Sequence, residues 1–190
     1  MRLELRPGFW LFLLLLAWLD PLDGFFPFLA ACALHEAGHL AAIRLCGGSV
    51  KGICLDFADA QIETGFLSDR AEMLCALAGP AVNLLCALSL RLLPEFAVLS
   101  LLLALGNLLP IRFLDGGRIL HAGLSLHLDA DAVYRVCEAV SIFCCVLLSA
   151  AAAWAMLAWK TGLWPLLGIL LLLLKHAKIG KTYDFPGFFG

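Results

Sequence analysis

Residues 25–46 read FFPFLAACALHEAGHLAAIRLC, and this stretch decides the fold of the chain. It is apolar along almost its whole length, and a helix needs about 20 such residues to cross a bilayer. Its middle nevertheless contains the ionisable side chains of His35, Glu36 and His39. Ionisable groups inside a membrane segment are costly and mark functional sites. The stretch therefore predicts a membrane helix that carries chemistry.

The rest of the 190-residue chain has the same apolar character, because 63% of all residues are hydrophobic and 15% are charged. Soluble domains average about 45–50% apolar and about 25% charged residues, which excludes a soluble globular domain. The chain has 13 Lys and Arg against 15 Asp and Glu. It lacks the basic excess that binds phosphates, so we expect no nucleic-acid partner. The composition predicts an integral membrane protein surrounded by the lipid bilayer.

Six segments have the length and apolarity of membrane-spanning helices, some of them marginally. They are residues 8–22, 25–46, 71–91, 95–113, 131–158 and 162–175. The first has a short apolar core behind two arginines, which is also the pattern of a signal peptide, but no small-x-small cleavage site follows it. We interpret it as a retained span. The sequence predicts an all-α polytopic membrane protein with about six transmembrane helices. We expect one domain over residues 1–190, with no appended soluble domain.

The positions of the basic residues predict the orientation, because Lys and Arg favour cytoplasmic loops. With the N-terminus in the cytoplasm, eleven of the 13 Lys and Arg residues fall on the cytoplasmic side. Only Arg91 and Lys160 then fall outside, together with the acidic Asp20 and Asp23. We expect both termini to be cytoplasmic.

Residues 47–66, between the second and third spans, differ from the apolar segments. Apolar side chains recur at every second position, at Ile53, Leu55 and Phe57 and again at Ala60 and Ile62. A period of two is typical of a strand with one apolar face. The pattern predicts a small β-hairpin over 49–64 on the cytoplasmic surface, between helices 2 and 3; a plain connecting loop is the alternative.

His35 and His39 lie one helical turn apart on the same face, so both imidazoles can reach one metal ion. Glu36 is turned about 100° from His35 and can touch a water at the ion without being a ligand. This is the HExxH arrangement of zinc proteases. A bound cation also offsets the cost of ionisable groups at membrane depth. The pattern predicts a metal site.

A catalytic zinc ion takes three protein ligands and leaves one position open, so a third ligand must come from elsewhere. Asp115 lies between Pro110 and Gly116-Gly117, which break helices. Irregular backbone at membrane depth lines a cavity, and an acid there can reach a neighbouring helix. The competitors are Cys32, which we interpret as core packing, and His121, which we interpret as an interfacial residue.

Three motifs occur in order along residues 25–120. They are His35-Glu36-x-x-His39, Gly79-Pro80-x-x-Asn83, and Asn107-Leu-Leu-Pro110 followed by Leu114-Asp115-Gly116-Gly117. In this combination the sequence resembles the site-2 proteases, which are intramembrane zinc metalloproteases. It looks most like the bacterial branch that includes the sporulation protease acting on a pro-sigma factor. Two features depart from the family: Phe113 stands where members often carry proline, and the nucleotide-sensing domain of some sporulation enzymes is absent.

The resemblance implies roles for individual residues. One Zn²⁺ per chain would be held by His35, His39 and Asp115, and Glu36 would be the general base. Asn107 would help to hold the substrate or the developing oxyanion. For Asn83, substrate contact is the weaker expectation, because an amide in a membrane helix is expected to face the protein interior.

The family also implies the substrate and the setting. We expect hydrolysis of a peptide bond in or near a transmembrane segment of a membrane-tethered transcription regulator or pro-sigma factor. The expected location is a bacterial cytoplasmic membrane, with a regulatory membrane partner beside the substrate. The hairpin at 49–64 is a candidate to bind an extended substrate by strand addition. The alternatives are a metal transporter or metal-binding protein that uses the same His/His/Asp site, and an inactive scaffold. Glu36 discriminates, because a transporter does not need a carboxylate that is not a ligand.

Overall fold

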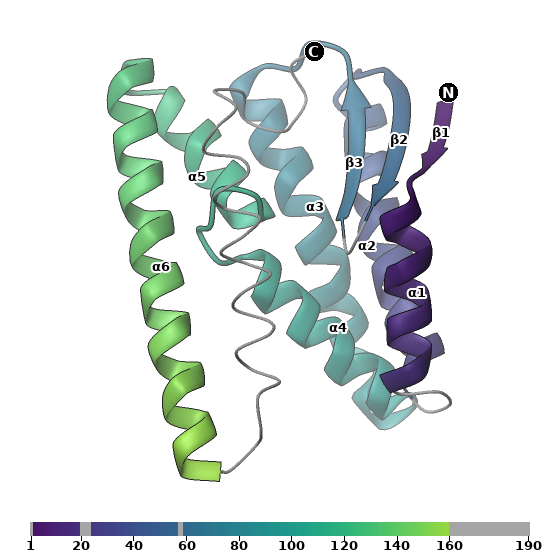
Figure 1. Cartoon of the computed structure of the whole chain (residues 1–190). Coiled ribbons are helices and arrows are strands. Elements are labelled where there is room, and N and C mark those ends of the chain that lie inside the picture. Colours follow the sequence, from purple (N-terminus) through teal and green to yellow (C-terminus); the bar gives the residue numbers. More distant parts are fainter. Residues whose placement is uncertain (1, 20–23, 57–58, 160–190) are drawn as a thin grey trace.

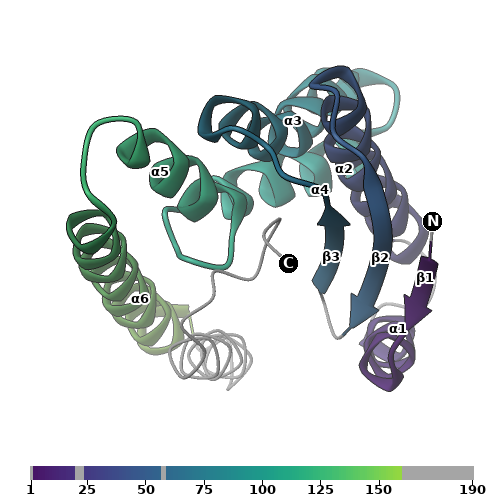
Figure 2. The ribbon, with the colours of Figure 1, turned by 90° about the horizontal axis from the view of Figure 1, so that it is seen from above.

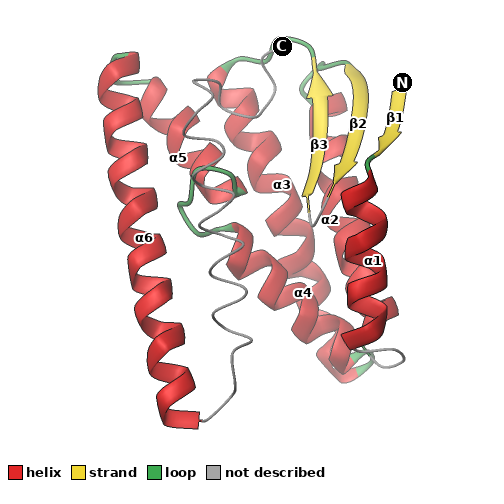
Figure 3. Ribbon diagram, viewed as in Figure 1, coloured by secondary structure: helices red, strands yellow, loops and turns green. Residues whose placement is uncertain are grey.

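The computed structural model describes residues 2–19, 24–56 and 59–159. Within them the chain forms six α-helices, one short 3₁₀ turn at Leu88–Arg91 and one three-stranded sheet (Figures 1 and 3). The helices are α1 (Pro7–Leu19), α2 (Phe25–Leu45), α3 (Asp69–Ala87), α4 (Pro94–Asn107), α5 (Asp115–Ser125) and α6 (Ala130–Trp159). The strands are β1 (Arg2–Leu5), β2 (Val50–Asp56) and β3 (Asp59–Thr64). The predicted span at 162–175 lies outside the described residues.

Three helical segments are long and apolar enough to cross a membrane: Phe25–Leu45, Asp69–Arg91 and Ala130–Ala158. They correspond to the second, third and fifth predicted spans. Helices α1 and α4 are apolar too, but they have 13 and 14 residues. At 1.5 Å per residue they are about 20 Å long, which is shorter than a hydrocarbon core of about 30 Å. The prediction of a mostly helical, polytopic membrane fold is confirmed.

The fourth predicted span, residues 95–113, is wrong as one continuous helix. Helix α4 ends at Asn107, and a separate helix, α5, begins at Asp115. Pro110 explains the break, because it has no backbone N–H and it disfavours helical geometry at the residue before it. The segment 108–114 between α4 and α5 is therefore irregular.

The sequence predicts that Gly116 and Gly117 break a helix, but the structure gives them a different role. They lie in the first turn of α5 and do not end a helix. The segment 108–114 folds back so closely that a Cβ at Gly116 would meet the carbonyl of Leu108, and one at Gly117 would meet the carbonyl of Ile111. The two glycines are needed for this close approach of backbone to backbone.

The predicted hairpin between helices 2 and 3 is confirmed. Strands β2 and β3 pair antiparallel, with Ile53 opposite Ile62. The sequence did not predict β1, which pairs parallel with the other edge of β2 and makes it the central strand. The sheet lies beside α1 and α2, and β2 and β3 run along the helices, with the end of β2 and the beginning of β3 toward the middle of the molecule (Figure 1). The sheet therefore extends into the molecule and is not confined to its surface.

Helices α2, α3 and α4 pack closely, and α5 lies between α3 and α6 (Figure 2). Small residues allow the close approach of α2 and α3: a Cβ on Gly38 would lie 2.9 Å from the carbonyl oxygen of Ala78. The hairpin is joined to these helices by a small apolar cluster of Ile43, Ile62, Leu67 and Cys75. This packing fixes α2, which carries the HExxH motif.

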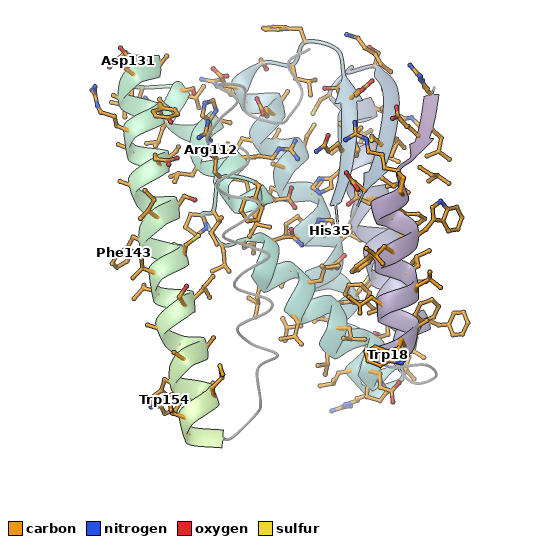
Figure 4. The ribbon with its side chains drawn as sticks, viewed as in Figure 1. Trp18, His35, Arg112, Asp131, Phe143 and Trp154 are labelled. Atoms are coloured by element: carbon orange, nitrogen blue, oxygen red, sulfur yellow. The ribbon has the colours of Figure 1, made fainter. Side chains whose placement is uncertain are left out.

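The outward faces of the helices are apolar, as expected of a lipid-exposed surface. Helix α6 exposes Phe143 and Trp154, which point away from the other helices in Figure 4. Trp18 and Trp154 lie toward one end of the molecule and Asp131 lies at the opposite end (Figure 4). Indole rings near helix ends are typical of interfacial anchors in membrane proteins.

Candidate metal centre

The structure brings three of the predicted site residues together. His35 and His39 come from the middle of α2, and Asp115 is the first residue of α5, 80 positions after His35. The Nε2 atom of His35 lies 3.0 Å from Oδ2 of Asp115 and 3.1 Å from Nε2 of His39. The third side of this triangle, from Nε2 of His39 to Oδ2 of Asp115, is 3.3 Å. His35 lies among the packed helices, between the two ends of the molecule (Figure 4).

This triangle has the size that a tetrahedral metal ion requires. Zinc bonds of about 2.0–2.2 Å place two ligand atoms about 3.3 Å apart, and the observed sides are 3.0, 3.1 and 3.3 Å. All three side chains are buried. Two imidazole nitrogens and a carboxylate oxygen that converge in this way need a proton or a cation between them. The donor set fits a divalent metal ion.

The hydrogen bond of His39 supports the same role. Its Nδ1 lies 2.7 Å from the carbonyl oxygen of Cys75 in α3. A carbonyl only accepts, so Nδ1 donates, and the neutral ring keeps its lone pair on Nε2, which faces His35 and Asp115. Metal-binding histidines commonly donate their other N–H to a backbone carbonyl. The buried Nδ1 of His35 has no hydrogen-bond partner within the described part of the chain.

Gly79 of α3 lies directly against the two imidazoles. A Cβ at this position would contact Nε2 of His39 and the ring of His35. The Gly79-Pro80 motif therefore provides space for the histidines. Asn83, one turn further along α3, is fully buried and is not among the residues that line the cavity described below.

A cavity of about 650 Å³ opens beside the three residues. Its walls come from α1, α2, β2, β3, α4, the segment 108–114 and α5. Pockets for small ligands have volumes of about 300–1,000 Å³, so the space accommodates a short stretch of peptide. Its lining is mainly apolar, with Phe12 and Phe28 in contact across α1 and α2. The polar side chains of the lining include those of the candidate site.

Glu36 and Asn107 both line this cavity. Glu36 is partly buried and makes no hydrogen bond to any residue that the structure describes. Asn107 donates one amide hydrogen from Nδ2 to the carbonyl of Leu103, at 3.0 Å. Cys32 also lines the cavity, and His121 lies further along α5; neither belongs to the ligand group of His35, His39 and Asp115.

The sequence did not indicate the role of two arginines that it places in cytoplasmic loops. Arg118 is largely buried, and its Nη1 lies 3.4 Å from Oδ1 of Asp115. The spacing of three residues within a helix is the signal that suggests this contact. Arg112, with a side chain 3% exposed, lies in the segment 108–114.

Arg112 joins the segment that precedes Asp115 to helix α6. Its Nη1 donates to Oε2 of Glu138 at 3.3 Å, and its backbone N–H donates to Oγ of Ser141 at 3.3 Å. Its guanidinium also lies 5.0 Å from the ring centroid of Tyr134. These three partners share one face of α6, because they are spaced by four and three residues. Figure 4 shows Arg112 on the inner side of α6.

No protein-family model and no curated protein matches the sequence. Among solved structures, the Site-2 Protease from Methanocaldococcus jannaschii matches with a TM-score of 0.65 and 21% sequence identity. The match covers 99% of this chain and 94% of that one. It shows that the chain has the fold of a site-2 protease over its whole length.

Proposed function

We propose that this protein is an intramembrane zinc metalloprotease of the site-2 protease type. The observation that carries the proposal is the convergence of His35, His39 and Asp115 next to Glu36, inside an apolar helical fold. The fold of the M. jannaschii site-2 protease supports it. The substrate is a peptide bond in or near the transmembrane segment of another membrane protein.

His35, His39 and Asp115 would hold one zinc ion. A bound zinc ion acts as a Lewis acid: it makes water acidic enough to react near neutral pH and polarises a carbonyl group. The chain supplies the geometry for this chemistry. The carbonyl of Cys75 fixes the ring of His39, and Gly79 leaves room for both imidazoles.

Glu36 is the general base and acid of the proposed reaction. It takes a proton from the attacking water and returns it to the amine that leaves. Its position supports this role, because it follows His35 directly, lines the cavity and has no competing hydrogen bond among the described residues. A donor to the developing oxyanion is the second amide hydrogen of Asn107, since the first is held by Leu103. Asn83 is not among the residues that line the cavity, and its contact with substrate stays the weaker prediction.

The substrate must be extended when it reacts, because a helix hides its carbonyl groups in hydrogen bonds. The outer edge of β3, away from β2, is the proposed binding place for this extended stretch. Strand β2 is paired on both sides, whereas β3 pairs only with β2 within the described residues. Ala60 and Ile62 of β3 line the cavity beside the site. A substrate strand added to β3 would lie beside the cavity that Glu36 also lines.

The proposed substrates are membrane-tethered transcription regulators or pro-sigma factors. The proposed setting is a bacterial cytoplasmic membrane with a regulatory membrane partner. The sporulation branch is the part of the family that the compact layout resembles. Co-expression with candidate single-span regulators would identify the substrate.

The function is tested by the Glu36→Gln variant. The substitution keeps size and polarity but removes the base, so we expect zinc to remain bound at one ion per chain and cleavage to fall by about 10²–10⁴-fold. Cleavage is measured on a co-expressed single-span substrate, and zinc by elemental analysis of the purified protein. His35→Ala is the matched control and should lose both.

The two alternatives give different results in the same experiment. A metal transporter would bind zinc, cleave no candidate and transport metal equally well with glutamine at position 36. An inactive scaffold would neither cleave a candidate substrate nor transport metal. Absence of stoichiometric zinc in the wild-type protein contradicts the protease proposal.

A further inference from the structure

The two oxygens of Asp115 have different surroundings. Oδ2 faces the imidazoles, at 3.0 Å from His35 and 3.3 Å from His39. Oδ1 faces the other way, toward Nη1 of Arg118 at 3.4 Å. Arg118 lies one turn further along α5, so the helix itself brings the guanidinium next to the carboxylate.

Arg118 is held in an acidic environment inside the protein. Its side chain is 17% exposed and interacts electrostatically with Asp115, and also with Glu72 and Glu36. Glu72, in the first turn of α3, is 6% exposed. Buried charges are stable only when opposite charges compensate them. Glu72 is not a candidate metal ligand. Its position gives it another role, in which its negative charge compensates the positive charge of Arg118.

We propose that Arg118 is a positioning residue for the metal site, and that Glu72 in turn anchors Arg118. The arginine fixes the rotation of the Asp115 carboxylate so that a single oxygen, Oδ2, faces the two imidazoles. This inference rests on the proposed metal site. Partners that orient ligands in this way commonly change metal affinity by about 10–100-fold.

The charges of the cluster agree with this arrangement. Glu36, Glu72 and Asp115 carry three negative charges when ionised, and Arg118 carries one positive charge. The cluster therefore lacks two positive charges, which a divalent cation supplies. Arg118 contacts Asp115 directly, and the negative charge of Glu72 on α3 acts on Arg118 electrostatically.

The first experiment measures metal binding and not activity. Arg118→Met, Arg118→Lys and the control Arg70→Gln, an exposed arginine of α3, are purified in detergent. Zinc affinity is measured by chelator competition, and the geometry of the site by the visible spectrum of the Co²⁺-loaded protein. We expect about 10–100-fold weaker zinc binding and an altered Co²⁺ spectrum for Arg118→Met, partial recovery for Arg118→Lys, and no change for the control. Wild-type affinity and spectrum in folded Arg118→Met protein overturn the proposal.

The second experiment separates positioning from stability. In Arg118→Met the carboxylates of Glu72 and Asp115 lose their buried counter-charge, so the thermal midpoint should fall. Adding Glu72→Gln removes one of these charges and should restore the midpoint in part, while zinc binding stays weak. If zinc binding recovers together with the midpoint, the role of Arg118 is only structural. Glu95→Gln, an exposed glutamate of α4, is the control for Glu72→Gln.

These outcomes are distinct from a failure of the proposed function. If the wild-type protein binds no divalent metal, the protease proposal fails and this inference fails with it. If the wild-type protein binds zinc and cleaves substrate, but Arg118→Met changes only the KM, Arg118 contacts the substrate and the positioning proposal alone is wrong.

Discussion

At Gly79, a single hydrogen atom in place of a side chain decides whether two imidazoles fit against α3. A methyl group there would contact both His35 and His39. We therefore predict that Gly79→Ala lowers the stability of the protein by about 1–3 kcal/mol through overpacking. Displaced imidazoles should also weaken zinc binding by about 10-fold or more. Thermal unfolding in detergent and elemental analysis measure the two effects.

Gly123 of α5 offers a matched control for this substitution. The nearest atom to a Cβ at Gly123 is the sulfur of Met73 at 3.9 Å, an ordinary contact. Gly123→Ala should leave zinc binding unchanged and stabilise α5 slightly, because alanine is the better helix former. The packing argument for Gly79 is wrong if Gly79→Ala binds zinc as tightly as Gly123→Ala.

How far individual residues were predictable depends on the range of the interaction. The fixed spacing of His35, Glu36 and His39 defines one helical face, so local sequence was enough to bring the two histidines together. Asp115 was a candidate only through the helix break beside it and the family resemblance. The contact of Gly79 with the histidines depends on how α3 packs against α2, and no local pattern encodes that distance.

Among the elements, the apolar helices followed from the length and apolarity of their segments, and the hairpin followed from its period of two. Two features did not. The segment 95–113 has continuous apolarity, yet it divides into α4 and the segment 108–114, since Pro110 outweighs hydrophobicity there. Strand β1 pairs with residues about 50 positions away, and four exposed residues carry no signal for such a pairing. Composition predicts what an element buries, and it does not predict which partner the element meets.

Strand β3 is the element on which substrate binding should depend. Successive residues of a strand direct their N–H groups to opposite edges, so one of Ala60 and Gln61 faces β2 and the other faces the outer edge of the sheet. Proline removes the N–H. We predict that the substitution at the residue facing outward keeps the fold and the zinc, and lowers kcat/KM about 10-fold for a transmembrane substrate.

The two variants, Ala60→Pro and Gln61→Pro, act as controls for each other. The one that faces β2 should lower the thermal midpoint, because it removes a bond between paired strands. Wild-type kcat/KM in the variant that keeps its fold would show that substrate does not pair with β3.

At the scale of the whole molecule, the orientation in the membrane determines the side from which the metal site and the edge of β3 can be reached. The N-terminal strand β1 and the beginning of α6, marked by Asp131, lie at the same end of the molecule (Figures 1 and 4). Trp18 and Trp154 lie toward the other end (Figure 4). We expect water to reach the site from the end of the molecule where β1 lies and α6 begins. We expect the outer edge of β3 to be accessible from the same end. The basic residues predict that this side is cytoplasmic.

Labelling of single cysteines with a membrane-impermeant maleimide tests this orientation in intact cells. The positions are Asp129, just before α6, and Glu95 in the first turn of α4, both exposed. Each is replaced by cysteine in a chain that carries Cys46→Ser, since Cys46 is itself exposed. We expect Glu95→Cys to react in intact cells, and Asp129→Cys to react only after the membrane is opened. Labelling of both positions from one side would contradict the predicted topology, and reaction of Asp129→Cys in intact cells would place the site entrance outside the cytoplasm. A substrate would then have to be cleaved from the opposite face, and a cytoplasmic regulator could not be released.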